Sequence, residues 1–125
     1  MAERANAYRL SFERGCVVQT NSALTLADGL AVRIPDPDAL DFIRKGAERI
    51  VEVSEDEIAE AIRNLYTDTH NLVEGAGAAP FAALMKEHNQ NQNLKAAIIL
   101  SGQNIDQSLM HTILSGVTPG LTCDA

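Results

Sequence analysis

Apolar residues recur at helical spacing in some parts of the chain and form short continuous runs in others. Helical spacing, capping residues and stop signals predict helices over residues 4–13, 37–45, 55–72, 79–86 and 107–116. Short runs rich in β-branched and aliphatic residues predict strands over residues 16–18, 49–53 and 96–100. Residues 22–33 show neither period and predict irregular structure, with a tight bend at Asp28-Gly29 or one helical turn. No internal repeat is present.

The alternation of helices and strands predicts an α/β fold. We expect one domain over residues 1–116, built as a three-layer open sheet of about three mainly parallel strands, with covering helices and right-handed crossovers. Residues 117–125 are expected to form a flexible tail. A chain of 125 residues can bury a single core of this kind.

The run from Ala96 to Leu100 is typical of a strand that is buried on both faces. It ends in a polar corner formed by residues 101–104. Ligands bind beyond the carboxyl ends of strands in open α/β sheets, so a site is expected at Ser101. A plain strand-to-helix turn is the alternative interpretation of the same residues.

The firmest local signal is Ser54, followed three residues later by Glu57, which is a capping-box pattern at a helix start. The apolar face of the helix that follows is predicted to contain Ile58, Ile62, Leu65 and Leu72. Asp36 followed by Pro37 predicts a second helix start. Residues 75–80 are dense in Gly and Ala, so the helix after them should pack closely on a neighbour or a ligand, and Pro80 places its regular start near residue 78 or 79.

Charge and cysteine content narrow the function classes. The chain has 10 Lys+Arg and 17 Asp+Glu, a net charge of −7, which disfavours nucleic acid and anionic membranes as partners. Cys16 and Cys123 lack metal-ligand spacing and are interpreted as ordinary thiols in a reducing compartment. No apolar stretch approaches the length of a membrane span, and we expect a cytoplasmic protein.

The residues alone carry little catalytic chemistry. The three histidines are isolated from one another, and the acidic set near residue 36 lacks the glycine and glutamate of a calcium loop. No nucleotide-binding glycine loop or nucleophile elbow occurs. A small-ligand corner at Ser101 is what remains.

Three stretches in this order and spacing resemble the pyridoxal-phosphate-dependent serine/threonine dehydratases, of the tryptophan-synthase-β-like fold type II. They are Thr25–Val32, Val53–Ile58 continuing to Val73–Ala79, and Ile99–Asp106. The resemblance covers nearly the whole chain and implies that it corresponds to the carboxyl-terminal part of such an enzyme, mostly its larger domain. It also implies pyridoxal phosphate (PLP) as the cofactor, and β-elimination of water with deamination of a hydroxy amino acid as the reaction.

The resemblance further implies which residues contact the cofactor. Ser101 would hydrogen-bond the pyridine nitrogen, with Gly102 beside it, while Glu74 and Gly75 would lie close to the ring. A neutral hydroxyl leaves the ring nitrogen unprotonated, which suits elimination of water. Gln103 stands where many relatives have Gly, which narrows the space beside Ser101.

The family's Schiff-base lysine and its glycine-rich phosphate loop match nothing in this chain, so we expect no catalytic residue and no catalysis by these 125 residues alone. The cation site of some relatives would match Glu3 and Ala7, but Arg9 replaces its last acidic residue. Expected partners are a second copy in a homo-oligomer, such as a dimer, or an upstream complementary chain. The alternatives to a dehydratase segment are a non-catalytic, self-associating α/β module and a small-ligand-binding domain.

Overall fold

The computed structural model describes residues 1–120, which form five α-helices and one 3₁₀ turn. The elements are α1 (Ala7–Arg14), η1 (Asp28–Leu30), α2 (Pro37–Gly46), α3 (Glu55–Thr69), α4 (Gly75–Lys86) and α5 (Gln107–Leu114). Each predicted helix is present, and the bend expected at Asp28-Gly29 is the 3₁₀ turn. Cys123 and most of the predicted tail lie outside the described residues, while residues 117–120 have no regular structure.

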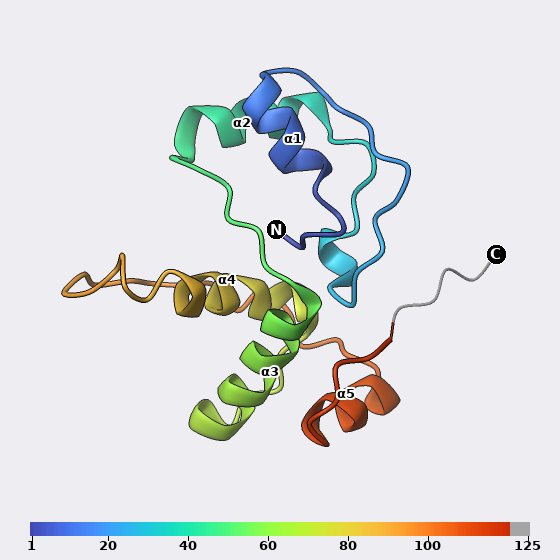
Figure 1. Cartoon of the computed structure of the whole chain (residues 1–125), viewed down its shortest axis with the longest axis vertical. Coiled ribbons are helices and arrows are strands. Elements are labelled where there is room, and N and C mark those ends of the chain that lie inside the picture. Colours follow the sequence, from blue (N-terminus) through green and yellow to red (C-terminus); the bar gives the residue numbers. More distant parts are fainter. Residues whose placement is uncertain (121–125) are drawn as a thin grey trace.

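The helices form two groups (Figure 1). α1 packs against α2 near the amino terminus, and α3 packs against both α4 and α5. The η1 turn contacts α4, so the loop that carries it links the first group to the second. The start of α4 therefore lies where the chain's early and late segments meet.

Side-chain caps fix where several helices begin. Ser54 and Glu57 form the predicted capping box, with Ser54 N–H donating to Glu57 Oε2 at 2.7 Å and Glu57 N–H donating to Ser54 Oγ at 3.2 Å. Asp36 accepts from the Ala39 N–H ahead of α2, with Pro37 in the first turn as predicted. Asp106 caps α5 in the same way.

Two helix boundaries differ from the predictions. α4 begins at Gly75 rather than near residue 78, so Pro80 lies inside the helix and offers no N–H to the carbonyl of Ala76. α3 ends at Thr69, because His70 adopts the left-handed conformation with φ 57°. Leu72 therefore does not lie on the buried face of α3 and is 48% exposed.

The predicted strands are not formed within residues 1–120. The one pairing is an isolated parallel bridge between Ala2 and Val53, in which Glu3 N–H donates to the Val53 carbonyl at 2.9 Å. Segments 16–18 and 96–100 lie without regular structure. A strand needs hydrogen-bonding neighbours, and no segment among the described residues supplies them to 96–100.

The core lies between α3, α4 and α5. Its largest fully buried aliphatic side chains are Ile58, Ile62, Ile113, Val53 and Val73. Small residues of α4 such as Ala78 and Ala82 let that helix approach α3 closely. Among residues 1–120, no helix combines the length and hydropathy needed to cross a membrane.

Candidate functional site

Glycines allow the loop before η1 to lie directly against the start of α4. A Cβ on Gly75 would come within 2.7 Å of Leu26 Cδ1 and 2.8 Å of Ala27 Cα. A Cβ on Gly29 would lie 2.9 Å from Ala76 Cβ. All three distances are shorter than real Cβ contacts, so these two segments approach as closely as their backbones permit. The predicted close packing of residues 75–80 is confirmed.

A third segment, which contains Gly102, also contacts the start of α4. The Glu74 N–H donates to the Gly102 carbonyl at 3.1 Å. A Cβ on Gly77 would stand 2.9 Å from that carbonyl oxygen, and a Cβ on Gly102 would overlap the Glu74 carboxylate. The two predicted site pairs, Glu74-Gly75 and Ser101-Gly102, therefore lie together although they are far apart in the sequence.

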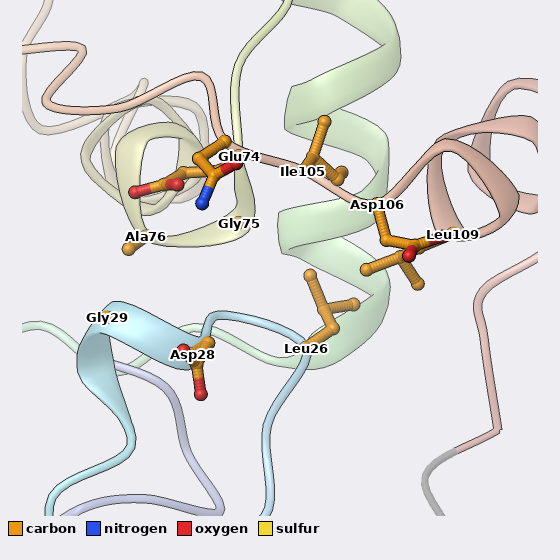
Figure 2. Close-up of a pocket in the computed structure, with 10 residues that line it drawn as sticks. Leu26, Asp28, Gly29, Glu74, Gly75, Ala76, Ile105, Asp106 and Leu109 are labelled. Carbon is orange, nitrogen blue, oxygen red and sulfur yellow. The ribbon is translucent and has the colours of Figure 1, made fainter.

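A cavity of about 350 Å³ opens where these segments meet (Figure 2). Its walls come from the η1 loop, the start of α4, and the segment that leads into α5. The lining residues are Leu26, Asp28, Gly29, Glu74, Gly75, Ala76, Asn104, Ile105, Asp106 and Leu109. The volume is in the range of small-molecule sites.

The cavity is acidic. Asp28, Glu74 and Asp106 line it, and no Lys or Arg does. The Ser108 hydroxyl donates to Asp106 Oδ1 at 2.6 Å, and backbone N–H groups of Ser108 and Leu109 add to this, so the pKa of Asp106 lies below its ordinary value. Asp106 is therefore an anion at neutral pH, and the cavity favours a cationic group over a phosphate.

The first turn of α4 is a source of positive potential at the cavity. Glu74 is the N-cap residue, but its side chain makes no capping hydrogen bond. The first N–H groups of a helix have no partner within the helix and carry a partial positive charge. The start of α4 can thus offer backbone donors to a polar atom in the cavity.

The predicted cofactor-binding residues divide into two sets. Glu74 and Gly75 line the cavity, and Gly102 contacts Glu74. Ser101 is exposed, lies next to Gly102, and is not part of the cavity wall. Gln103 is also exposed.

Several lining residues were not assigned a site role from the sequence. Asp28 and Gly29 fall in the first of the three quoted stretches, which was the available signal. Asp106 was predicted as a helix cap, and it fills that role while also facing the cavity. Leu26 lies in the same stretch as Asp28, whereas Leu109 gave no signal, because an apolar residue near a helix start does not reveal what it faces.

The other candidate groups lie elsewhere. Arg9 forms ion pairs with Glu52 at 2.7 Å and with Glu13 at 2.6 Å, while Glu3 is exposed and Ala7 is buried in α1. Within residues 1–120, no three His, Cys, Asp or Glu side chains are placed to hold a metal ion. Two of the three lysines form ion pairs, Lys45 with Asp41 and Lys86 with Glu57, and no lysine lines the cavity.

Comparison with known proteins gives one family. Residues 1–102 match the family described as pyridoxal-phosphate dependent enzyme. The L-threonine ammonia-lyase of Geobacter sulfurreducens is 40% identical over 104 residues, which are 83% of this chain and 26% of that protein. The catabolic L-threonine dehydratase TdcB of Escherichia coli K12 is 36% identical over 114 residues, which are 90% of this chain and 35% of that protein.

Solved structures agree with the sequence relatives. The processed form of threonine deaminase isoform 2 from Solanum lycopersicum superposes with a TM-score of 0.83 at 28% identity, covering 91% of this chain and 34% of that one. The fold thus falls in the α/β class of fold-type-II enzymes. The chain belongs to the pyridoxal-phosphate-dependent enzyme family, and its predicted resemblance to the serine/threonine dehydratases is confirmed. It spans about a quarter to a third of the length of the two relatives named above.

Proposed function

We propose that these residues form the pyridine-nitrogen flank of the PLP site in a threonine/serine dehydratase. The complete site would eliminate the β-hydroxyl of a hydroxy amino acid as water and release the amino group as ammonia. The observation that carries the proposal is the meeting of Glu74 and Gly102, from two separate stretches that resemble the family, beside an acidic cavity. We also propose a cytoplasmic location, which is consistent with this function.

The residues present fit one side of the cofactor. When bound, PLP supplies an electron sink for the charge that develops at the substrate Cα. The Ser101 hydroxyl would donate to the unprotonated ring nitrogen, and Gly102 leaves the backbone beside it uncovered by a side chain. Gly75 does the same on the facing segment.

The same residues do not fit the other side of the cofactor. A phosphate dianion would meet Asp28, Glu74 and Asp106 in the cavity without a Lys or Arg to balance them. No lysine is placed there for covalent attachment. The phosphate cradle and the attachment lysine must then come from residues outside these 125, which supports the absence of catalysis by this chain alone.

The acidic wall gives this flank a role toward the substrate. A free amino acid carries an ammonium group, which three nearby carboxylates attract. Asp106 is ionised at neutral pH, as an ordinary aspartate is, and its lowered pKa keeps it ionised in more acidic solution, so it supports this role without a proton change. Ser101 and the carboxylates thus act on different molecules, the hydroxyl on the ring and the carboxylates on the amino acid.

The test is a PLP titration of the full chain followed by absorbance and by amide chemical shifts near residue 102. Ser101→Ala should weaken PLP binding by about 3- to 10-fold, since one neutral hydrogen bond is worth about 0.5–1.5 kcal/mol. Ser22→Ala removes an equally exposed hydroxyl far along the chain and should leave binding unchanged. Equal binding by the wild type and Ser101→Ala would overturn the assigned role of Ser101.

A second measurement addresses activity. The chain alone should release no ammonia from L-threonine in the presence of PLP, because none of its three lysines lines the cavity. Ammonia release faster than that of PLP without the protein would contradict the claim that this flank is inactive by itself.

A further inference from the structure

We infer that segment 95–101 is a docking strand, which inserts between two β-strands of the remaining part of a dehydratase fold. The inference rests on the proposed function, because it identifies the partner that would complete that site. The partner that receives the segment is the portion of the fold that carries the phosphate cradle and the attachment lysine. Four observations on the segment support it.

The first observation is the unpaired backbone. Among residues 1–120, no hydrogen bond reaches an N–H or C=O group of residues 95–101. Pairing resumes only at Gly102, whose carbonyl accepts from Glu74, and ends before the segment at Leu94, whose N–H donates to the Asn91 carbonyl. Seven consecutive residues thus have backbone donors and acceptors without a partner among residues 1–120, as an unpaired strand does.

The second observation is that apolar side chains on both sides of the segment are at least partly exposed. Ile99 is 78% exposed and Leu100 is 37% exposed, and Ala96 and Ala97 are exposed as well. Successive residues of a strand point to opposite faces, so Ile99 and Leu100 would face opposite sides of a sheet. The segment therefore has the side chains of a strand that is covered on both faces.

The third observation is that nothing protects the edge. Natural edge strands carry charges, prolines or bulges that prevent pairing. Lys95 is the one charged residue of the segment and stands at its first position, while from Ala96 to Leu100 there is no charged residue and no proline. An unprotected strand of this kind is suited to a position between two neighbours rather than at the border of a sheet.

The fourth observation distinguishes between two possible partners, a second copy of this chain and the remainder of a dehydratase fold. A second copy paired through the same segment would cover one backbone edge and leave the other edge bare. The remainder of a dehydratase fold can cover both edges and both faces. This backbone follows that of a threonine deaminase over 91% of its length but spans 34% of that chain, so most of the fold that could surround the segment lies outside these residues.

Docking there would also position the site. Ser101 is the last residue of the segment, and the next residue, Gly102, accepts a hydrogen bond from the Glu74 N–H. Fixing residues 95–100 between two strands would orient the Ser101 hydroxyl, which is exposed in the free chain. The interface and the proposed ring contact are thus adjacent along one strand.

The experiment co-expresses the full chain, with an affinity tag, and the part of the Geobacter sulfurreducens L-threonine ammonia-lyase that lies upstream of the region matching this chain. Complexes are isolated without PLP, and their mass is measured by light scattering. We expect a complex with equal numbers of the two chains. In hydrogen exchange, amides of residues 96–100 should be unprotected in the free chain and at least 100-fold slower in the complex.

Ile99→Lys should weaken the complex at least tenfold, because it places a charge in an apolar, paired strand. Phe42→Lys is the matched control, since Phe42 is 76% exposed on α2 and lies outside the segment. Neither substitution removes a buried contact, so both variants should fold like the wild type. Circular dichroism checks this.

Three results would overturn the inference. They are an Ile99→Lys complex as tight as that of the wild type, amides 96–100 that stay unprotected in the complex, and an upstream part that remains insoluble whether or not the wild-type chain is present. A chain that instead dimerises alone, and that Ile99→Lys makes monomeric, would assign the segment to a second copy and also overturn it. If the complex forms but Ser101→Ala does not change its PLP affinity, the ring contact fails while the interface stands.

Discussion

The Glu74 carboxylate lies directly over Gly102, and the Glu74 N–H donates to the Gly102 carbonyl at 3.1 Å. This contact joins the start of α4 to the segment that precedes α5. It is possible because residue 102 has no side chain. The relative placement of the two predicted site pairs therefore depends on one missing methyl group.

Gly102→Ala should destabilise the chain. The added Cβ overlaps the Glu74 carboxylate, so either that side chain or the backbone must move, and overpacking of this kind costs about 1–3 kcal/mol. Gly46→Ala is the control, because a Cβ there meets nothing within 4 Å and Gly46 ends α2. It should raise the free energy of unfolding by about 0.5–1 kcal/mol. Urea unfolding measures both, and equal effects would show that the Glu74–Gly102 contact is loose.

Glu55→Ala should destabilise the part of the cavity wall that residues 26–29 form. Glu55 Oε2 accepts from the Leu26 N–H at 2.8 Å, and losing that partner costs about 1–3 kcal/mol if the N–H stays unsatisfied. Asp56→Ala removes a neighbouring acid from the same helix turn, where it is exposed, and should cost only the helix-dipole term of about 0.3–1 kcal/mol. Unfolding curves that coincide for the two variants would contradict the role of the Leu26 bond.

Local structure could be predicted because its causes lie a few residues apart. The Ser54–Glu57 capping box and the Asp36 cap with Pro37 each depend on a few adjacent residues, and the structure contains both. The end of α3 could not be predicted this way. His70 terminates it in a left-handed conformation, which a non-glycine residue adopts only where the surrounding chain requires it.

Pairing between distant segments could not be predicted from the sequence. The run Ala96–Leu100 predicted a strand, yet a strand exists only where other strands supply hydrogen bonds, and residues 1–120 offer none to it. The cavity illustrates the same limit of prediction from sequence. Glu74 and Gly75 were assigned from family resemblance, whereas Asp28 and Leu109 line the same cavity only because η1 and α5 bring them there.

The Glu57 carboxylate, at the start of α3, should make the free energy of unfolding depend on pH in acidic solution. Partial burial raises its pKa, but the Ser54 backbone N–H and the Lys86 ammonium outweigh this and lower the pKa below the ordinary value of 4.5. A lowered folded-state pKa gives a contribution that is complete above the ordinary value and is lost as the pH falls through the folded value. Urea unfolding at about pH 7 and about pH 3 should show this loss in the wild type.

Glu57→Gln is the control for the acid effect. Glutamine keeps an oxygen that can accept from the Ser54 N–H, as capping boxes allow, but it neither titrates nor pairs with the Lys86 charge. Its free energy of unfolding should therefore fall less between the two pH values. A decrease as large as that of the wild type would mean that other carboxylates, such as Asp106, account for the acid sensitivity.

The most apolar strand predicted from the sequence should contribute almost nothing to the stability of the free chain. Ile62→Ala removes a buried side chain from the core and should lower the free energy of unfolding by about 2–5 kcal/mol. Ile99→Ala removes the same side-chain atoms from a position that is 78% exposed and should change it by no more than about 0.5 kcal/mol. If Ile99→Ala costs as much as Ile62→Ala, segment 95–101 is already buried in solution by another chain. Measuring both variants over a range of protein concentrations separates the two cases, because only burial by a second chain makes the cost depend on concentration.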